Sequence, residues 1–489
     1  MLLILVAIVL LPRPGGRGLE PQWWMILAVW GGLALVVLCA WSWSRRLLRE
    51  MSQGNPLKSL SRAESIMRFT QWTAVSALAL ATFGFGWTEL VRNGIGDLLL
   101  LDEVAALLPV FLVFVLTWWI FHPFEVRVRE GRLVRDLDEG VPISIPPSRK
   151  AWVGLQIRTQ LLLLLLPILL IGSAADLGGM LSLMAISDAP MWMERSAAFI
   201  AAVPMICLAP WVVVRMMDAV PLPSGEVRTA LEDTCRRAGV RIRNLMLWRT
   251  GGTLYNGAVT GFFPSLRWVL LSDGLVQRLE RDEVLAVMAH ELAHVRRRHM
   301  LWLAASLIAS GLAIGFMVDP IVESIQRDLF TGGGDFDELR WKMEWVDLIA
   351  LGSVLAGVLL MFGWVSRRFE RQADAFAAVQ MSGGSPGKSV VTVRPEGADA
   401  MRSALGAVAD LNGVKRQRWS WRHGSIAGRQ RHLQSIEGLP SNGLPIDRVV
   451  RRINFVSTAV ILAAIVVGGM EMLGTDSEKA AQTAPVKVD

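Results

Sequence analysis

The sequence predicts a mainly α-helical fold in which polytopic transmembrane helices accompany a hydrophilic domain with a small β-sheet. Hydrophobic residues make up 53% of the 489 residues and charged residues only 19%, which is unusual for a water-soluble protein. The apolar residues come in uninterrupted blocks, and about 20 helical residues are enough to cross roughly 30 Å of hydrocarbon. Tryptophans cluster at several block ends, where interfacial aromatic anchors are expected.

Eight apolar blocks are long enough to be membrane spans. They are Met25–Trp43, Trp72–Leu90, Val104–Phe121, Leu161–Leu177, Ala197–Val214, Leu301–Val318, Val346–Trp364 and Val456–Leu473. A further run, Met1–Leu11, is short and lacks a preceding basic segment. It could be a marginal first span or part of a targeting segment.

The charges of the connecting segments alternate along the chain. Lysine and arginine concentrate in Arg45–Arg68, Arg127–Arg158, Arg215–Arg298 and Arg367–Arg452, whereas Asp176–Glu194 and Asp319–Trp345 are acidic or sparsely charged. Because basic loops stay on the cytoplasmic side, both large hydrophilic segments are expected there. The formal charge of +7 is then explained by topology and by contact with the anionic lipid bilayer, and no nucleic-acid partner is expected.

The chain has three cysteines, Cys39, Cys207 and Cys235. Two lie in candidate spans and the third lies in a predicted cytoplasmic helix. The sequence therefore indicates neither a disulfide framework nor a cysteine-based metal site.

These patterns divide the chain into six parts. They are 1–215, an N-terminal transmembrane region of five or six spans; 216–299, the first part of the hydrophilic domain; 300–365, two transmembrane helices; 366–452, the second part of the domain; 453–474, a C-terminal transmembrane helix; and 475–489, a polar tail. The composition of the tail predicts disorder.

The first part of the hydrophilic domain shows short strand-like runs and helices. The runs Leu245–Trp248, Leu254–Val259 and Trp268–Leu271 predict strands, with a turn-rich joint between the second and third that is typical of a meander. The predicted helices are Glu226–Ala238, which ends at Gly239; a short helix opened by Asp273 and Gly274; a long helix with Asp282 as its N-cap that ends near His299; and, in the second part, Ala398–Leu411.

The long helix carries the strongest chemical signal. His290, Glu291 and His294 form the pattern His-Glu-x-x-His. Residues i and i+4 share one face of a helix, so both imidazoles can bind one zinc ion. Glu291 lies beside the first histidine, where it can act as general base. The alternative is a pair of surface histidines on an amphipathic helix.

A catalytic zinc needs a third protein ligand and an open position. Glu370 is the candidate, and Asp374 follows it at i+4 on the same helical face. One carboxylate can bind the metal while the other accepts a hydrogen bond from a ligand imidazole. The alternative is an ordinary charged helix in which Glu370 pairs with Arg367 or Arg371.

These residues resemble the integral-membrane zinc metallopeptidases that include the HtpX-type proteases of bacteria and the CAAX prenyl endopeptidases. The resemblance covers roughly Val220–Leu439. It rests on Asn256-Gly257-Ala258, Leu271-Ser272-Asp273-Gly274-Leu275, the His290–His294 motif, Glu370-x-x-Ala373-Asp374, and His423-Gly424-Ser425-Ile426 followed by Arg429, with Gly424 where proline is usual.

The resemblance implies a zincin-like (gluzincin) metallopeptidase domain with one catalytic zinc ion. The residues that it implies as ligands are His290, His294 and Glu370, with Glu291 as base and Asp374 as the orienting carboxylate. Asn256 and Ala258 would bind substrate on an edge strand, where an extended peptide can pair.

The sequence leaves open which residue stabilises the oxyanion of the tetrahedral intermediate. His423, Arg429 and Tyr255, the only tyrosine, could each supply a donor, although His423 could instead be a packed helix-start residue. His299 and His432 are interpreted as surface or interfacial residues.

The expected function is a membrane-embedded zinc metalloendopeptidase that hydrolyses peptide bonds of membrane or membrane-proximal proteins. The expected location is a bacterial inner membrane, with the active site facing the cytoplasm. The alternative is a signalling sensor whose zinc-protease domain cleaves one dedicated regulator. A transporter or channel is disfavoured because the spans carry few ionisable residues.

Overall fold

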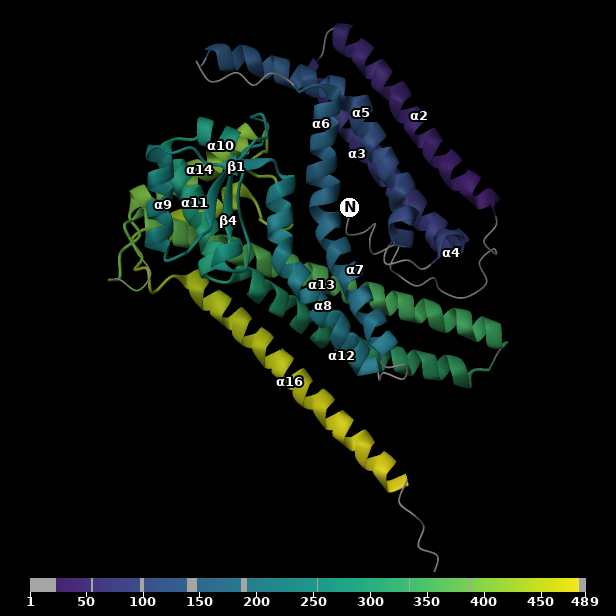
Figure 1. Ribbon diagram of the computed structural model, residues 1–489. Helices are drawn as coiled ribbons and strands as arrows, with labels where there is room; N and C mark the ends of the chain where they lie inside the picture. Colours follow the sequence, from purple (N-terminus) through teal and green to yellow (C-terminus); the bar gives the residue numbers. More distant parts are fainter. Residues whose placement is uncertain are drawn as a thin grey trace, which may run out of the picture. The chain divides into compact units, whose positions relative to one another are not determined.

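The computed structural model describes residues 23–53, 56–96, 101–138, 147–185, 191–252, 254–333, 335–385, 387 and 389–482. The described residues are mainly helical and include one small four-stranded sheet, which confirms the predicted fold class. Figure 1 shows the helices and the sheet along the chain. The described residues belong to two compact units. The first unit comprises Met1–Leu222 and Ile242–Arg278, and the second comprises Pro223–Arg241 and Leu279–Asp489.

Seven described helices are long and apolar enough to cross a membrane, and a bent pair would make an eighth. The first unit holds α2 (Trp24–Gln53), the bent pair α3 (Pro56–Phe85) and α4 (Trp87–Ile95), α5 (Leu101–Asp138), α7 (Leu163–Ala185) and α8 (Met191–Met216); the second holds α12 (His299–Thr331), α13 (Phe336–Met381) and α16 (Pro445–Gln482). Six of the eight predicted spans lie within one of these helices; Trp72–Leu90 lies across α3 and α4, and Leu161–Leu177 begins just before α7. The run Met1–Leu11 lies outside the described residues, and α16 extends to Gln482, into the tail for which we predicted disorder.

The predicted span Trp72–Leu90 is not one straight helix. The chain bends by 76° between α3 and α4. Gly86 stands at the bend with φ 69°, in the left-handed region that glycine adopts without a steric penalty. The indole nitrogen of Trp87 donates to the carbonyl of Ala106 at 3.0 Å, which fixes α4 against α5.

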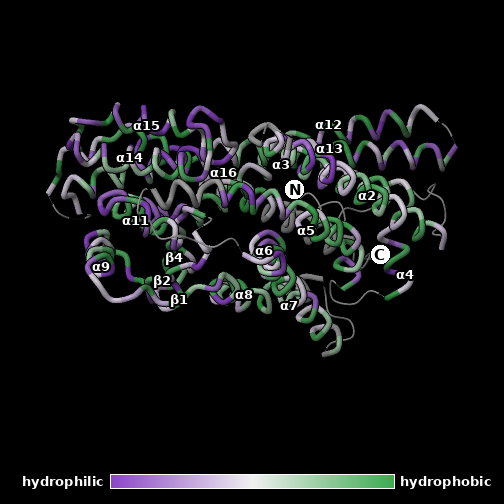
Figure 2. Tube along the Cα trace, turned by 90° about the horizontal axis from the view of Figure 1, so that it is seen from above, coloured by the Kyte–Doolittle hydropathy of each residue, from purple (hydrophilic) through white to green (hydrophobic). Residues whose placement is uncertain are grey.

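The first unit contains an apolar bundle and the sheet. Val110, Phe114 and Trp118 on α5 are buried with Leu78 on α3 in one hydrophobic cluster. Two shorter helical segments, α6 (Arg149–Gln156) and the π-helix η1 (Ile157–Leu162), lead into α7. Hydrophobic residues dominate α2, α5 and α7, whereas hydrophilic residues are frequent on α9 and α15 of the second unit (Figure 2).

The sheet has strand order β1-β2-β4-β3. The strands are β1 (Ala219–Pro221), β2 (Asn244–Trp248), β3 (Gly257–Thr260) and β4 (Trp268–Ser272). β3 and β4 pair antiparallel, as the predicted meander requires, whereas β2 pairs with β4 in parallel. β1 was not predicted, and the strand predicted to begin at Leu254 begins at Gly257. A short 3₁₀ turn, η2 (Pro264–Leu266), lies between β3 and β4, and α10 (Asp273–Arg278) follows β4.

The second unit is built from α9 (Glu226–Ala238), α11 (Arg281–Arg296), α12, α13, α14 (Pro395–Leu411), α15 (Ile426–Ser435) and α16. The helix predicted for α9 has the observed bounds and ends at Gly239, whose φ is 66°. The predicted N-cap of α11 was wrong, because the cap is Glu280 rather than Asp282. The side chain of Glu283 accepts a hydrogen bond from the Glu280 amide at 3.0 Å, which satisfies a backbone donor that the helix leaves free.

α11 ends earlier than predicted, and a new helix begins at His299. Arg298 has φ 55°, a conformation that ends one helix and redirects the chain. The helix predicted to reach His299 therefore stops at Arg296, and His299 opens α12. This break decides where the His299 side chain points.

α13 has 46 residues, so it is about 69 Å long. This length is more than twice the thickness of the hydrocarbon core of a bilayer, which is roughly 30 Å. Its apolar stretch Val346–Trp364 therefore accounts for only part of the helix. Glu370 lies about 9 Å beyond Trp364 along the helix axis. One rigid helix thus connects a candidate span to the polar residues of the site.

Candidate metal centre

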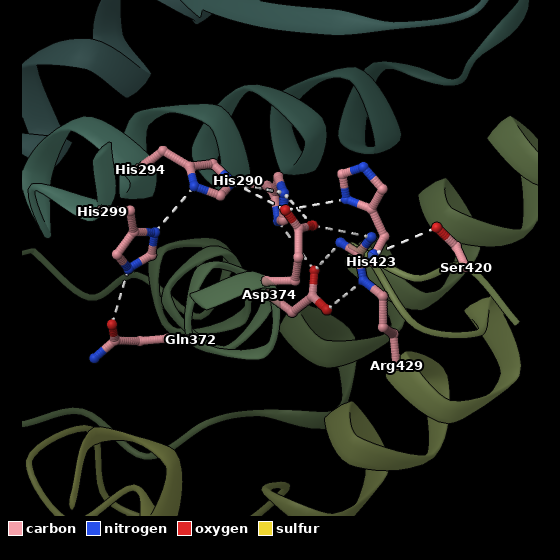
Figure 3. Close-up of polar contacts among 9 residues, drawn as sticks. His290, His294, His299, Gln372, Asp374, Ser420, His423 and Arg429 are labelled. Carbon is pink, nitrogen blue, oxygen red and sulfur yellow. Dashed lines mark hydrogen bonds and ion pairs between the residues drawn. The ribbon is translucent and has the colours of Figure 1, made fainter. Parts of the chain in front are cut away.

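His290 and His294 on α11 direct their rings toward each other (Figure 3). Their ligand atoms and a carboxylate oxygen of Glu370 on α13 lie within 4.8 Å of one another. The Nε2 atoms of the two histidines are 3.3 Å apart. Glu370 Oε2 lies 3.6 Å from Nε2 of His290, and Glu370 Oε1 lies 3.8 Å from Nε2 of His294. His290 and Glu370 are each only 7% exposed. The interpretations as surface histidines and as an ordinary charged helix do not fit this geometry.

The distances fit the coordination of zinc. Zinc binds imidazole nitrogen at about 2.0–2.1 Å with tetrahedral angles, which places two nitrogen ligands about 3.3 Å from each other. The separation of the two Nε2 atoms, 3.3 Å, matches this value, and the distances to the Glu370 oxygens are slightly longer. Two imidazoles and one carboxylate are also a ligand set that leaves one zinc position open. The donor set therefore fits one catalytic zinc ion.

Glu291 follows His290 directly on α11 and is partly buried. Burial raises the pKa of its carboxyl to about 7, while the positive charges of His290, Arg429 and His423 act in the opposite direction. A carboxyl group with a pKa near neutrality is well matched to accept and return a proton. The position and the electrostatics of Glu291 therefore suit a general base.

The two histidines have different electrostatic environments in the metal-free chain. Burial disfavours the charged form of His290, but the adjacent carboxylates of Asp374 and Glu370 outweigh it and raise the pKa of His290 to about 10. Burial and the charge of His290 lower the pKa of His294 to about 3. Because metal binding requires both imidazoles to be neutral, metal would displace the proton from His290.

Asp374 lies behind His290, on the side away from Nε2. Its Oδ1 is 3.0 Å from Nδ1 of His290, although the ring is not aligned for a regular hydrogen bond. Arg429 donates to both carboxylate oxygens of Asp374, at 2.8 and 2.6 Å, and lies 3.3 Å from Glu370. Asp374 is fully buried and Arg429 is 7% exposed. A bidentate pair of this kind fixes both side chains.

We expect Asp374→Asn to lower the free energy of unfolding by about 3 kcal/mol, because breaking a buried ion pair leaves the Arg429 charge poorly compensated. Denaturant unfolding of the purified chain in detergent measures this effect. Asp399→Asn is the matched control, because Asp399 forms an exposed pair with Arg402 on α14 and exposed pairs contribute little. Equal stabilities of the two variants would contradict this account of the buried pair.

His423 approaches the centre from a loop before α15. Its Nδ1 lies 3.1 Å from Glu370 Oε1, and the side chain is 48% exposed. The loop closes through two backbone hydrogen bonds between Ser420 and Gly424, and Gly424 has φ 75°. Proline, which is usual here in the similar family, has φ near −65° and no N–H, so it could form neither feature. Gly424 therefore allows the loop that carries His423 to adopt a backbone conformation that proline could not adopt at this position.

The sequence-based interpretation of His299 was wrong. His299 is 3% exposed rather than superficial, and its Nδ1 lies 2.9 Å from Nδ1 of the candidate ligand His294. Its Nε2 lies 2.9 Å from Oε1 of Gln372, a residue that sequence reasoning did not single out. The spacing of His299 five residues after His294, beyond the helix break, is the signal that could have identified it.

Asn256, Ala258 and Tyr255 belong to the first unit. Asn256 is exposed. Its carbonyl accepts a hydrogen bond from the Ser272 amide, and its own amide donates to the Ser272 hydroxyl. Ala258 lies on β3 opposite Leu270. Tyr255 is 7% exposed, and its ring lies close to the Cα of Gly274, so that a β-carbon there would contact the ring at 3.0 Å.

Comparison with known proteins finds that residues 221–435 match Peptidase family M48. A Protease HtpX homolog from Nitrosomonas eutropha is 29% identical over 184 residues, covering 36% of this chain and 61% of that protein. A second Protease HtpX homolog, from Leptothrix cholodnii, is 30% identical over 158 residues, covering 31% of this chain and 50% of that protein. The matches thus span about half to three fifths of these relatives.

The crystal structure of Ste24p from S. mikatae is also similar, with a TM-score of 0.46 and 16% identity over 85% of this chain and 100% of that chain. The M48 match includes His290, His294, Glu370 and Asp374. The sequence match and the HtpX homologues lead to the same family as the motifs. Residues 221–435 of this multi-pass membrane chain are therefore similar to peptidase family M48 and to the HtpX homologues.

Proposed function

We propose that the chain is a membrane-embedded zinc metalloendopeptidase that hydrolyses peptide bonds of membrane or membrane-proximal proteins. The observation that carries this proposal is the convergence of His290, His294 and Glu370, with Nε2 atoms 3.3 Å apart, next to Glu291. Surrounding residues support the same chemistry, because Asp374 and Arg429 hold the ligands in place.

Zinc bound at such a site lowers the pKa of a coordinated water to about 7 and polarises a carbonyl group. Glu291 would take a proton from the attacking water and return it to the leaving amine. Glu291 adjoins the candidate ligand His290 on α11, so its carboxylate is placed to carry this proton.

The roles of Arg429 and His423 follow from how exposed each side chain is. Arg429 is buried and its donors already contact Asp374 and Glu370, so we assign it to holding these carboxylates. His423 is 48% exposed and has one ring nitrogen beyond its contact with Glu370. We therefore assign the donor for the developing oxyanion to His423, since such donors act where charge appears in the transition state.

The edge strand β3 supports a binding mode for extended peptides. It is the last strand of the order β1-β2-β4-β3, and its outer edge pairs with no other described strand. A peptide could add to this edge through main-chain hydrogen bonds. We propose that Asn256 and Ala258 contribute to substrate binding in this way.

The helices support a substrate close to the membrane. α12 begins at His299, just after the helix that carries the two histidines, and α13 leads from a candidate span to Glu370. The basic segments Arg215–Arg298 and Arg367–Arg452 support a site that faces the cytoplasm. We propose a bacterial inner membrane as the location.

Removal of metal tests the proposal. We expect a chelator to abolish cleavage of an unfolded protein by the purified full chain in detergent, and stoichiometric zinc to restore it, because the water must be activated at the centre. The same chelator presaturated with zinc is the control. Cleavage that continues in the metal-free chain would contradict the assignment.

Substrates would then be identified by comparing the protein content of membranes that contain the wild type with that of membranes that contain Glu291→Gln. Proteins that accumulate with the inactive variant are candidates. Many unrelated proteins would favour a general endopeptidase, whereas a single accumulated protein would favour the sensor that cleaves one regulator.

A further inference from the structure

A series of polar contacts leads from the candidate ligand His294 in the direction away from His290 (Figure 3). Nδ1 of His294 lies 2.9 Å from Nδ1 of His299, and Nε2 of His299 lies 2.9 Å from Oε1 of Gln372. The amide nitrogen of Gln372 donates to Asp447 Oδ1 at 2.6 Å. Asp447 also lies 3.4 Å from Arg297. The chain of contacts thus links α11, α12, α13 and α16.

The position of each proton in this series of polar contacts follows from the way in which His294 would bind the metal. Nε2 of His294 faces the other ligands, so a neutral His294 that binds metal through Nε2 carries its proton on Nδ1. Nδ1 of His299 must then accept, which leaves the proton of His299 on Nε2 to donate to Oε1 of Gln372. The Gln372 amide donates to Asp447, because a carboxylate only accepts. Each group therefore has one permitted role.

His299 cannot exchange its partners for bulk water. It is 3% exposed and Gln372 is 4% exposed. The His299 ring also stacks on Phe369, with centroids 4.7 Å apart and an angle of 7° between the planes. Loss of the His299 acceptor would leave the Nδ1–H of the partly buried His294 without this partner, which is unfavourable.

The two candidate histidine ligands are held differently. His290 has the Asp374 carboxylate directly behind it, which is a common arrangement at zinc sites. His294 has a neutral imidazole behind it, and the carboxylate of Asp447 is reached only through Gln372. Asp447 lies in the first turn of α16. The orientation of one ligand thus depends on the position of the C-terminal helix.

We propose that His299 is a positioning residue that fixes the tautomer and orientation of His294 and, through Gln372, couples metal affinity to Asp447 on α16. This inference rests on the proposed function in one respect, the binding of metal by His290, His294 and Glu370. It does not depend on which substrate is cleaved.

The test measures zinc affinity of the full chain in detergent by competition with a chromophoric chelator. We expect His299→Phe to weaken zinc binding by about 10–100-fold, the usual effect of losing a partner behind a metal ligand. His299→Asn should recover part of this loss, because the asparagine oxygen can accept from Nδ1 of His294. The absorption spectrum of bound cobalt(II) should shift in His299→Phe and return toward that of the wild type in His299→Asn.

Gln372→Leu and Gln380→Leu form a matched pair on α13. Both remove a buried glutamine, but Gln380 donates to the carbonyl of Thr234 at 3.1 Å and is not part of the chain of contacts. We expect weaker zinc binding for Gln372→Leu only. This pair decides the question if His299→Phe does not fold, as judged by thermal unfolding of the metal-free chain.

Zinc affinity in His299→Phe or Gln372→Leu equal to that of the wild type would overturn the inference. A wild-type chain that binds no zinc would overturn both the inference and the proposed function. If the wild type binds zinc and the His299 effects are found but no peptide is cleaved, the inference stands and the proposed peptidase activity fails.

Discussion

Glu291→Gln is expected to lower peptide cleavage by about 10²–10⁴-fold, the usual contribution of a general base, while zinc binding stays at the wild-type level. Glutamine keeps the shape and polarity of the side chain but cannot accept the proton of the attacking water. Glu291 is not among the three groups that converge on the metal position, so its replacement leaves the ligand set complete. Initial rates with one peptide and metal analysis of the same sample measure the two quantities.

Asp282→Asn is the control for this variant, because it makes the same kind of change at an exposed position of the same helix. We expect it to retain both activity and zinc. If Glu291→Gln turned over peptide as fast as Asp282→Asn, another group would have to be the base.

Glu370→Ala is expected to weaken zinc binding by more than about 100-fold, beyond the effect of losing a partner behind a ligand. The variant removes the oxygens that lie 3.6 and 3.8 Å from the two Nε2 atoms, so two imidazoles would have to hold the ion alone. It also removes a partner of Arg429 and of His423. Zinc competition and retained metal after gel filtration measure the loss.

Glu437→Ala is the matched control. Glu437 also pairs with an arginine in the second unit, Arg402 at 3.4 Å, but lies outside the centre. It should bind zinc as the wild type does. Undiminished zinc affinity in Glu370→Ala would show that another residue supplies the third ligand.

Local periodicity explains what could be predicted from the sequence. Spans are long apolar runs, and His290 and His294 lie one helical turn apart, as do Glu370 and Asp374, so helix geometry alone brings each pair to one face. The hairpin of β3 and β4 follows from two short runs around a turn. The fold class and the candidate ligands could therefore be identified from neighbouring residues.

The backbone details that were missed depend on single residues whose conformations the pattern does not reveal. Gly86 bends a predicted span, and Arg298, at φ 55°, starts a new helix at His299. Strand β1 has only three residues and is recognisable only by its pairing with β2. In each case the surrounding structure selects a local conformation that the sequence alone permits but does not require.

By itself, the sequence determined the membrane-spanning helices, the His-Glu-x-x-His helix and the second helix with its two carboxylates. Only the tertiary structure decided which groups stand behind the ligands. His299 and Gln372 are 73 positions apart, and Gln372 and Asp447 are 75 positions apart. The physical reason is that contacts between distant segments arise from helix packing. The periodicity of helices and strands relates only residues that are close together along the chain.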